Sequence, residues 1–294
     1  MATDARAITE HLCGKWHRRY GAAPCPICQP EGRKEQNALT LADGRDGRWL
    51  LNCKKAGCSF TDILAAAGVS PGSHAAPDPA GMARRDAEAK ADAEKRERQA
   101  RALWSEARPI AGTLVETYLR ARGITCALPN TLRFHPACWH PTAKRFPAMI
   151  ARVDGVERFA AHRTYLRPDG SGKAEVTPPR AMLGAVAGGA VRLTQAEGPL
   201  VVAEGIETAL SLACGLLRVP ATIWAALSTS SLCCLHLPDP PGRLTIASDG
   251  DDAGRAAAHA LAERAHALGW AVSLLPAPDG TDWNDILNLK GASA

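Results

Sequence analysis

Two short acidic motifs each follow an apolar run in the last third of the sequence. Glu204 and Gly205 follow the run PLVVA (199–203), and the segment from Asp249 to Gly254, which includes Asp251, follows RLTIAS (243–248). Clustered carboxylates without thiol or imidazole partners suit Mg²⁺ or Mn²⁺. Taken alone, the second motif is equally well explained as a polar loop that caps the next helix. The pairing of the two motifs favours a divalent-metal site, with glycines permitting close turns.

Four cysteines near the N-terminus form two close pairs. Cys25 and Cys28 are separated by 24 residues from Cys53 and Cys58. Each pair can place two thiolates on one tight turn, and two such turns complete the closed tetrahedral shell of a structural zinc. The spacing therefore predicts a zinc ribbon with these four ligands. Three further residues lie nearby as alternatives for one ligand, namely His11, Cys13 and His17.

Basic residues surround the second cysteine pair. Lys54 and Lys55 lie within it, and the neighbouring sequence adds Trp49 and four cations, Arg18, Arg19, Arg33 and Lys34. Cations with an aromatic ring can grip a nucleic-acid strand through phosphate contacts and stacking. Solvated surface charge is the alternative interpretation.

The elements that must position these groups follow from hydrophobic patterning. The apolar runs 199–203, 221–226, 243–248 and 271–275 alternate with helical segments at 207–217 and 253–269. Such β-α-β alternation predicts a parallel sheet covered on both faces, with sites at the carboxyl ends of the strands. The acidic motifs fall at those ends. Asp252 is expected to cap the helix that follows.

Composition shifts divide the rest of the chain. We expect a zinc-ribbon domain at 1–70, with a short helix capped by Thr61, and a linker and solvated charged helix at 71–108. A basic α+β module at 109–195, which contains the strand-like AVRLT, and a parallel-sheet domain at 196–294 complete the chain. The fold class is therefore mixed α/β and α+β.

Net charge differs sharply between the last two segments. Residues 109–195 carry 12 Lys and Arg against 5 Asp and Glu, whereas residues 196–294 carry 5 against 11. A basic region beside an acidic one is expected where one part holds polyanions and the other holds cations. Two unrelated solvated surfaces are the alternative. Candidate anion-binding residues in the basic segment are Arg163, Arg167, Lys173 and Arg180.

Several classes of protein are excluded. No window approaches the roughly 20 apolar residues of a membrane-spanning helix, and the charged start MATDARAITE lacks the apolar core of a signal peptide. A cytoplasmic location, where thiols stay reduced, is therefore expected. No GxxxxGK[ST] loop is present, so any ATP-driven helicase would be a separate partner. The chain is too short for the strand-passage gate of a topoisomerase.

The acidic motifs resemble the Toprim domain of DnaG-type primases, topoisomerases and some nucleases, over about 195–290. Three segments, VVAEGIETALS, IASDGDDAGRAAA and TDWNDIL, are similar to those of Toprim proteins from phages, plasmids and other mobile elements. Those proteins commonly begin with a zinc ribbon. This resemblance implies that Glu204 is an acid/base candidate and that Asp249 and Asp251 hold Mg²⁺ or Mn²⁺. Asp282 and Asp285 lie where related primases carry additional acids.

The resemblance implies a DNA primase, a nucleotidyltransferase that makes primers on single-stranded DNA from nucleoside triphosphates. The carboxylates would hold metal for attack of a 3′-hydroxyl on an α-phosphorus, while the basic segment would bind template and triphosphate. A Toprim nuclease is the enzymatic alternative. A non-catalytic nucleic-acid-binding replication or transfer factor is the other.

Overall fold

The computed structural model describes residues 4–17, 19–32, 36–44, 47–70 and 79–291. The chain divides into two compact units, residues 1–90 and residues 91–294. Most of the expected linker, 71–78, lies outside the described residues, as do Arg18, Arg33 and Lys34. The predicted charged helix is present as α3 (Pro79–Glu106), which runs from the first unit into the second. No described helix is long and apolar enough to cross a membrane.

The first unit is a four-stranded antiparallel sheet with two short helices. Its strands lie in chain order, and its elements are α1 (Ala5–His11), β1 (Lys15–His17), β2 (Tyr20–Ala23), β3 (Leu39–Asp43), β4 (Trp49–Cys53) and α2 (Phe60–Ala66). Alternate residues of β3, Leu39 and Leu41, enter a small core with Ile8. The cap of α2 is Ser59, whose hydroxyl accepts the N–H of Asp62 at 3.2 Å, so the expected cap Thr61 was wrong.

The second unit begins with an antiparallel sheet. Its strands lie in chain order: β5 (Arg108–Pro109), β6 (Leu132–Trp139), β7 (Arg145–Val153), β8 (Ala160–Tyr165) and β9 (Arg180–Leu183). Helix α4 (Leu114–Ala121) packs against one face. Against the other face pack Ala100, Leu103 and Trp104 of α3, although the sequence predicted a solvated helix. Apolar residues at i, i+3, i+4 give this end of the helix a packing stripe that its many charges conceal.

The second sheet of this unit has the order β10-β12-β11-β13-β14. Its strands are β10 (Val191–Thr194), β11 (Leu200–Ala203), β12 (Thr222–Ala225), β13 (Arg243–Ala247) and β14 (Ala271–Leu274). The last four strands are parallel, which confirms the predicted parallel sheet. The segment AVRLT, which the sequence assigned to the basic module, supplies the antiparallel edge strand β10.

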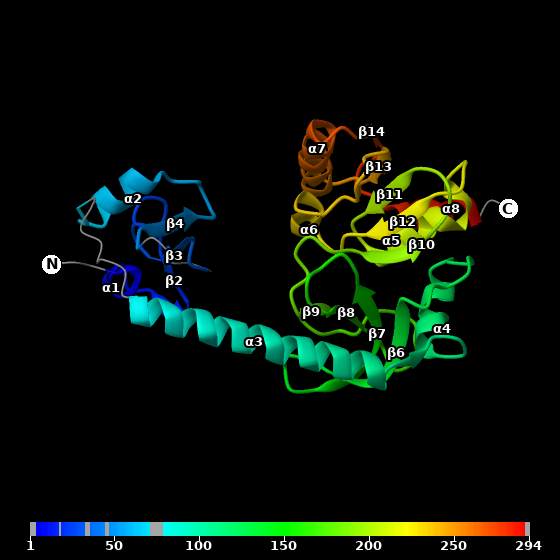
Figure 1. Ribbon diagram of the computed structural model, residues 1–294, viewed down its shortest axis with the longest axis horizontal. Helices are drawn as coiled ribbons and strands as arrows, with labels where there is room; N and C mark the ends of the chain where they lie inside the picture. The colour runs from blue at the N-terminus through cyan, green and yellow to red at the C-terminus, as the bar shows by residue number, and fades with distance from the viewer. Residues whose placement is uncertain (1–3, 18, 33–35, 45–46, 71–78, 292–294) are drawn as a thin grey trace. The chain divides into compact units, whose positions relative to one another are not determined.

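Helices cover both faces of this sheet, as Figure 1 shows. They are α5 (Ile206–Ser211), a π-helical turn η1 (Leu212–Leu216), α6 (Thr229–Cys233), α7 (Asp252–Ala267) and α8 (Trp283–Gly291). Successive residues of β11 enter opposite layers: Val201 packs with α5 and Val202 packs with α7. The predicted helix 207–217 kinks in its second half, where Gly215 has φ 90°.

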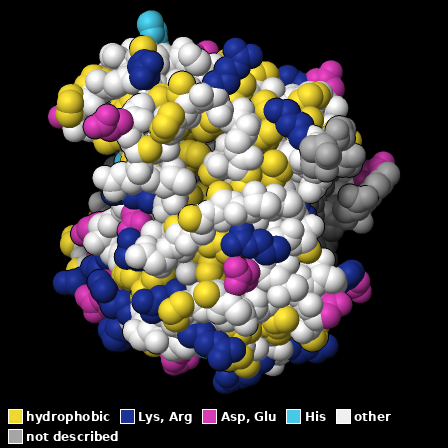
Figure 2. Space-filling model, turned by 90° about the vertical axis from the view of Figure 1, so that its right-hand side faces the viewer, with side chains coloured by type: hydrophobic (Ala, Val, Ile, Leu, Met, Phe, Trp, Pro, Cys, Tyr) yellow, Lys and Arg dark blue, Asp and Glu magenta, His cyan; other side chains and the backbone are white. Residues whose placement is uncertain are grey.

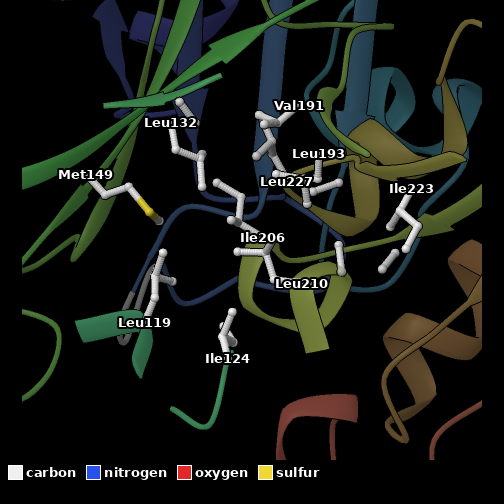
Figure 3. Close-up of a cluster of buried hydrophobic side chains, with 14 of the residues drawn as sticks. Leu119, Ile124, Leu132, Met149, Val191, Leu193, Ile206, Leu210, Ile223 and Leu227 are labelled. Carbon is white, nitrogen blue, oxygen red and sulfur yellow. The ribbon is translucent and has the colours of Figure 1, made fainter. Parts of the chain in front are cut away.

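One hydrophobic core joins the two sheets of the second unit. Figure 3 shows Leu132 of β6 and Met149 of β7 beside Ile206 and Leu210 of α5. Leu119 of α4 belongs to the same cluster. All five side chains are buried. Burial of this apolar surface, at roughly 25 cal/mol per Å², holds the basic module against the acidic domain.

Candidate active site

Glu204 and Asp249 lie side by side at one edge of the parallel sheet. Ala203, the last residue of β11, pairs in register with Ala247, the last residue of β13. Glu204 therefore leaves the sheet beside Ser248 and Asp249, although 45 positions separate the two acids in the sequence. Gly250 has a steric role, since a Cβ there would overlap the carbonyl oxygen of Pro278.

Four carboxylates interact at this edge. Burial, together with the negative charges of Glu204, Asp282 and Asp251, raises the pKa of Asp249 to about 6, although the hydrogen bond from the Thr208 hydroxyl acts to lower it. Burial also raises the pKa of Glu204; Arg180 opposes this and Asp251 adds to it. A neighbouring negative charge disfavours the ionised form of a carboxyl group and so raises its pKa.

The residues present fit a divalent cation. Asp249 Oδ1 is buried and has no hydrogen-bond partner among the residues that the structure describes. A buried carboxylate oxygen without a partner is unfavourable unless a bound cation or water satisfies it. The donors are all hard oxygens, which Mg²⁺ and Mn²⁺ prefer. Glu204, Asp249 and Asp251, with Asp282 behind them, are the residues that would hold the ion.

Two of the acids also begin helices. Asp251, rather than Asp252, is the cap of α7, and its Oδ1 accepts the N–H of Gly254 at 2.6 Å. The expected cap Asp252 was wrong, because it is the first helical residue and is exposed. Asp282 Oδ1 accepts the N–H of Asp285 at 2.9 Å, and Asp285 Oδ2 accepts the N–H of Asp282 at 3.0 Å. This reciprocal pair fixes both side chains at the start of α8, and the charge of Asp282 acts on Asp249.

The four basic candidates occupy different places. Arg180 pairs in register with Thr164 and influences Glu204. Lys173 Nζ lies 3.0 Å from Glu207 Oε1. Arg163 instead donates to the carbonyl oxygens of Trp139 and Met182, at 3.1 and 3.3 Å, and stacks near Tyr165, whose side chain packs with α3.

The remaining candidate, Arg167, forms an exposed ion pair with Glu175 at 2.5 Å. Arg180 thus acts on Glu204 at the sheet edge and Lys173 contacts Glu207 of α5, whereas Arg163 and Arg167 are engaged elsewhere. Figure 2 shows further Lys and Arg side chains gathered over the lower half of the face drawn there. This half is at the level of α4 and of the antiparallel sheet β5–β9 in Figure 1.

Sequence reasoning missed three residues near the site. Glu207 and His162 are buried, and Tyr118 donates its hydroxyl to Glu207 Oε1 at 2.5 Å. Burial lowers the pKa of His162 to about 4, so its imidazole is neutral near pH 7. Glu207 is a charged residue in α5, a helix in which every residue is buried. Charged residues are seldom fully buried unless they are paired, so a charge within this helical segment was the available signal.

The four predicted cysteines meet in the first unit. One Sγ atom from each of Cys25, Cys28, Cys53 and Cys58 lies within 4.8 Å of the others, and no other such group occurs in the described parts of the chain, so His11, Cys13 and His17 are not members. Burial acts to raise the pKa of Cys53, but the backbone N–H groups of Ala56, Cys58 and Lys55 outweigh it and lower the pKa to about 6. Burial raises the pKa of Cys28 and Cys58, so the fit to zinc rests on the convergence of four sulfur atoms.

Lys54 and Lys55 are exposed beside this cluster. Together with Gln29 and Asn37 they line a surface pocket of about 550 Å³. Neither lysine is part of the hydrophobic core of the first unit.

The acidic site predicts a pH effect on stability. The pKa of Asp249 is raised to about 6 in the folded state, so this state binds a proton near pH 6 that the unfolded chain binds only near pH 4. Without metal, lowering the pH from 7 to 5 should raise the Tm of the parent relative to Asp249→Asn by a few degrees. Differential scanning calorimetry at both pH values measures this difference. An unchanged difference would contradict the crowded-carboxylate interpretation.

Comparison with known families agrees with this geometry. Residues 199–293 match the model of the Toprim domain, so this part of the chain is a Toprim domain and the resemblance noted in the sequence is confirmed. Residues 94–193 match a domain of unknown function, DUF7146. No curated protein matches the chain.

Solved structures similar to this chain include primases. A DNA primase domain from Pseudomonas aeruginosa is 18% identical, with 66% of this chain and 75% of that chain covered and a TM-score of 0.41. The Aquifex aeolicus primase (zinc-binding and RNA polymerase domains) is 13% identical, with 98% and 80% covered and a TM-score of 0.40. The primase fragment of the bacteriophage T7 primase-helicase protein is 14% identical, with 92% and 95% covered and a TM-score of 0.34.

Proposed function

We propose that the protein is a primase-like nucleotidyltransferase that makes short primers on single-stranded DNA for a phage or other mobile element. The observation that carries the proposal is that cations of the basic module approach acids of the Toprim domain: Arg180 acts on Glu204, and Lys173 lies 3.0 Å from Glu207. Acids that repel polyphosphates are useful for nucleotide chemistry only when cations and metal lie beside them.

The roles of the residues follow from their charge. Asp249 and Asp251, with Asp282, would hold Mg²⁺ or Mn²⁺, which when bound lowers the pKa of a primer 3′-hydroxyl and neutralises phosphate charge. Glu204, whose pKa is raised by burial, is the candidate to accept a proton. Arg180 and Lys173 would bind the triphosphate.

The other proposed contacts are with the template strand. Arg163 and Arg167, with Lys54 and Lys55 of the ribbon, would contact template phosphates. Each unit would thus contribute two cations to template binding. A replicative helicase would be a separate partner.

The proposed organisation keeps four segments. These are a zinc ribbon at 1–70, a linker and helix at 71–108, the basic module at 109–195 and the Toprim domain at 196–294. A Toprim nuclease would need the same acids but has less use for the ribbon and for Lys173 beside the acids. The zinc ribbon and the basic neighbours therefore favour synthesis over cleavage.

Primer synthesis is tested directly with the purified full chain. We expect incorporation of labelled nucleotides on single-stranded DNA with Mg²⁺ or Mn²⁺, and ribonucleotides and deoxyribonucleotides are supplied separately. Omission of DNA and addition of a chelator are the controls. Shortening of the DNA without incorporation would favour the nuclease, and tight DNA binding with neither reaction would favour the non-catalytic factor.

A further inference from the structure

Glu207 is an ionised carboxylate inside the second unit. Only 5% of the residue is exposed. Its Oε1 accepts the Tyr118 hydroxyl at 2.5 Å and lies 3.0 Å from Lys173 Nζ. Burial acts to raise the pKa of Glu207, but the Lys173 ammonium and the Tyr118 hydrogen bond outweigh burial and lower the pKa to about 2. The carboxylate is therefore charged at neutral pH.

Three distant segments meet at this carboxylate. Tyr118 belongs to α4, Lys173 to the loop between β8 and β9, and Glu207 to α5 of the Toprim domain. The main chain at Lys173 is fixed by a β-bridge to Leu166. A buried ion pair contributes little to stability compared with apolar residues of similar volume. Stability alone therefore does not account for the pair.

Lys173 retains capacity for a second partner. Its side chain is 30% exposed, whereas that of Glu207 is 7% exposed. An ammonium group carries three N–H donors, and Glu207 accepts one of them. The others are available to an anion that approaches from solvent.

Arg180 connects this ion pair to the carboxylate site. Its charge opposes the burial that raises the pKa of Glu204, and it also acts on Tyr118 and His162, which both sense Glu207. Because His162 is neutral, the positive charge that acts on this ring comes from Arg180, Lys173 and Arg163.

Arg180 pairs in register with Thr164, and Lys173 is bridged to Leu166, two residues farther along the chain than Thr164. Residues two apart on a strand share a face, so Arg180 and Lys173 lie at successive positions on the same face, where one polyphosphate can reach both.

We propose that Glu207 is a positioning residue that holds the Lys173 ammonium at the carboxylate site, where its free N–H groups bind the phosphates of a nucleoside triphosphate. This inference rests on the proposed function. The lysine ammonium is carried on a flexible four-carbon stem, so without Glu207 it would occupy many positions in solvent. Ordering the cation before the nucleotide arrives reduces the entropy lost on binding.

The test measures nucleotide affinity and turnover on the full chain. Fluorescent ribo- and deoxyribonucleoside triphosphates with Mg²⁺ report Kd for the parent, Glu207→Gln, Lys173→Met and the double variant. We expect Kd and KM to rise about 10- to 100-fold in Glu207→Gln, with a smaller change in kcat. In the Lys173→Met background, Glu207→Gln should have no further effect, which a general loss of structure would not reproduce.

Controls separate positioning from folding. Glu263→Gln makes the same chemical change at an exposed site on α7 and should leave Kd and KM unchanged. If Glu207→Gln does not melt cooperatively, Glu207→Asp decides, because it keeps the charge but withdraws the carboxylate from Lys173. Glu207→Asp should then weaken nucleotide binding.

Two results would overturn the inference in different ways. If the parent binds nucleotide and makes primers, and the folded Glu207 variants match it while Lys173→Met fails, Lys173 needs no positioning. If the parent neither binds triphosphate nor incorporates it, the proposed function itself is wrong and the inference falls with it.

Discussion

Asp249→Asn is expected to abolish nucleotide incorporation while the protein remains folded. The substitution preserves the volume of the side chain but removes the charge of the most crowded carboxylate. Cations held by carboxylates stabilise developing charge by several kcal/mol, so the rate should fall on the order of 10³-fold. Incorporation on single-stranded DNA measures the loss. Glu204→Gln and Asp251→Asn should behave in the same direction.

Thermal melting distinguishes this loss from unfolding. Without metal, Asp249→Asn should melt at the same temperature as the parent or slightly higher, because close like charges oppose folding. Mg²⁺ should raise the Tm of the parent but not of Asp249→Asn, since a ligand stabilises only the state that binds it. Asp252→Asn is the matched control, because Asp252 is exposed at the start of α7. Full activity in Asp249→Asn would contradict the Toprim mechanism.

Removal of zinc is expected to unfold the first unit and leave the second folded. Cys25 and Cys53 are buried within a core of few large side chains, so the thiolate shell is part of that core. Structural zinc contributes about 10–16 kcal/mol of binding free energy in small zinc-finger peptides. Elemental analysis should give one zinc per chain. Cys25→Ser with Cys58→Ser should abolish it.

Hydrogen exchange locates the effect. In the double variant or after chelation, peptides from 15–70 should lose protection, whereas peptides from 130–250 should keep it. Cys233→Ser with Cys234→Ser is the matched control, since both cysteines are exposed and outside the cluster. Zinc content near zero in reduced parent protein, or retention of zinc in Cys25→Ser with Cys58→Ser, would overturn the assignment.

Local patterns predicted the elements that carry chemistry. The apolar runs 199–203 and 243–248, which are followed by Glu204 and Asp249, indicated two strands whose carboxyl ends meet. The structure pairs these strands in register. The spacing of the four cysteines likewise predicted one cluster, because two tight turns place two thiols each. Both inferences depend on short-range geometry, which a sequence contains.

Helix caps and packing faces were less accessible. Ser59 and Asp251 cap helices where Thr61 and Asp252 were expected, because adjacent polar residues compete and the backbone decides among them. The end of α3 packs on a sheet despite its charged composition, because Ala100, Leu103 and Trp104 form a narrow stripe.

Local patterns therefore predicted the two candidate centres, a parallel sheet with acids at its edge and a four-cysteine cluster. Which cations accompany the acids depends on the packing of distant segments. Arg163 lies in β8 and Arg180 in the neighbouring strand β9. Arg180 acts on Glu204, whereas Arg163 donates to the carbonyl oxygens of Trp139 and Met182. Tyr118 and Glu207 are 89 residues apart. Contacts at such separations arise from the packing of two sheets on one core, which no local pattern specifies.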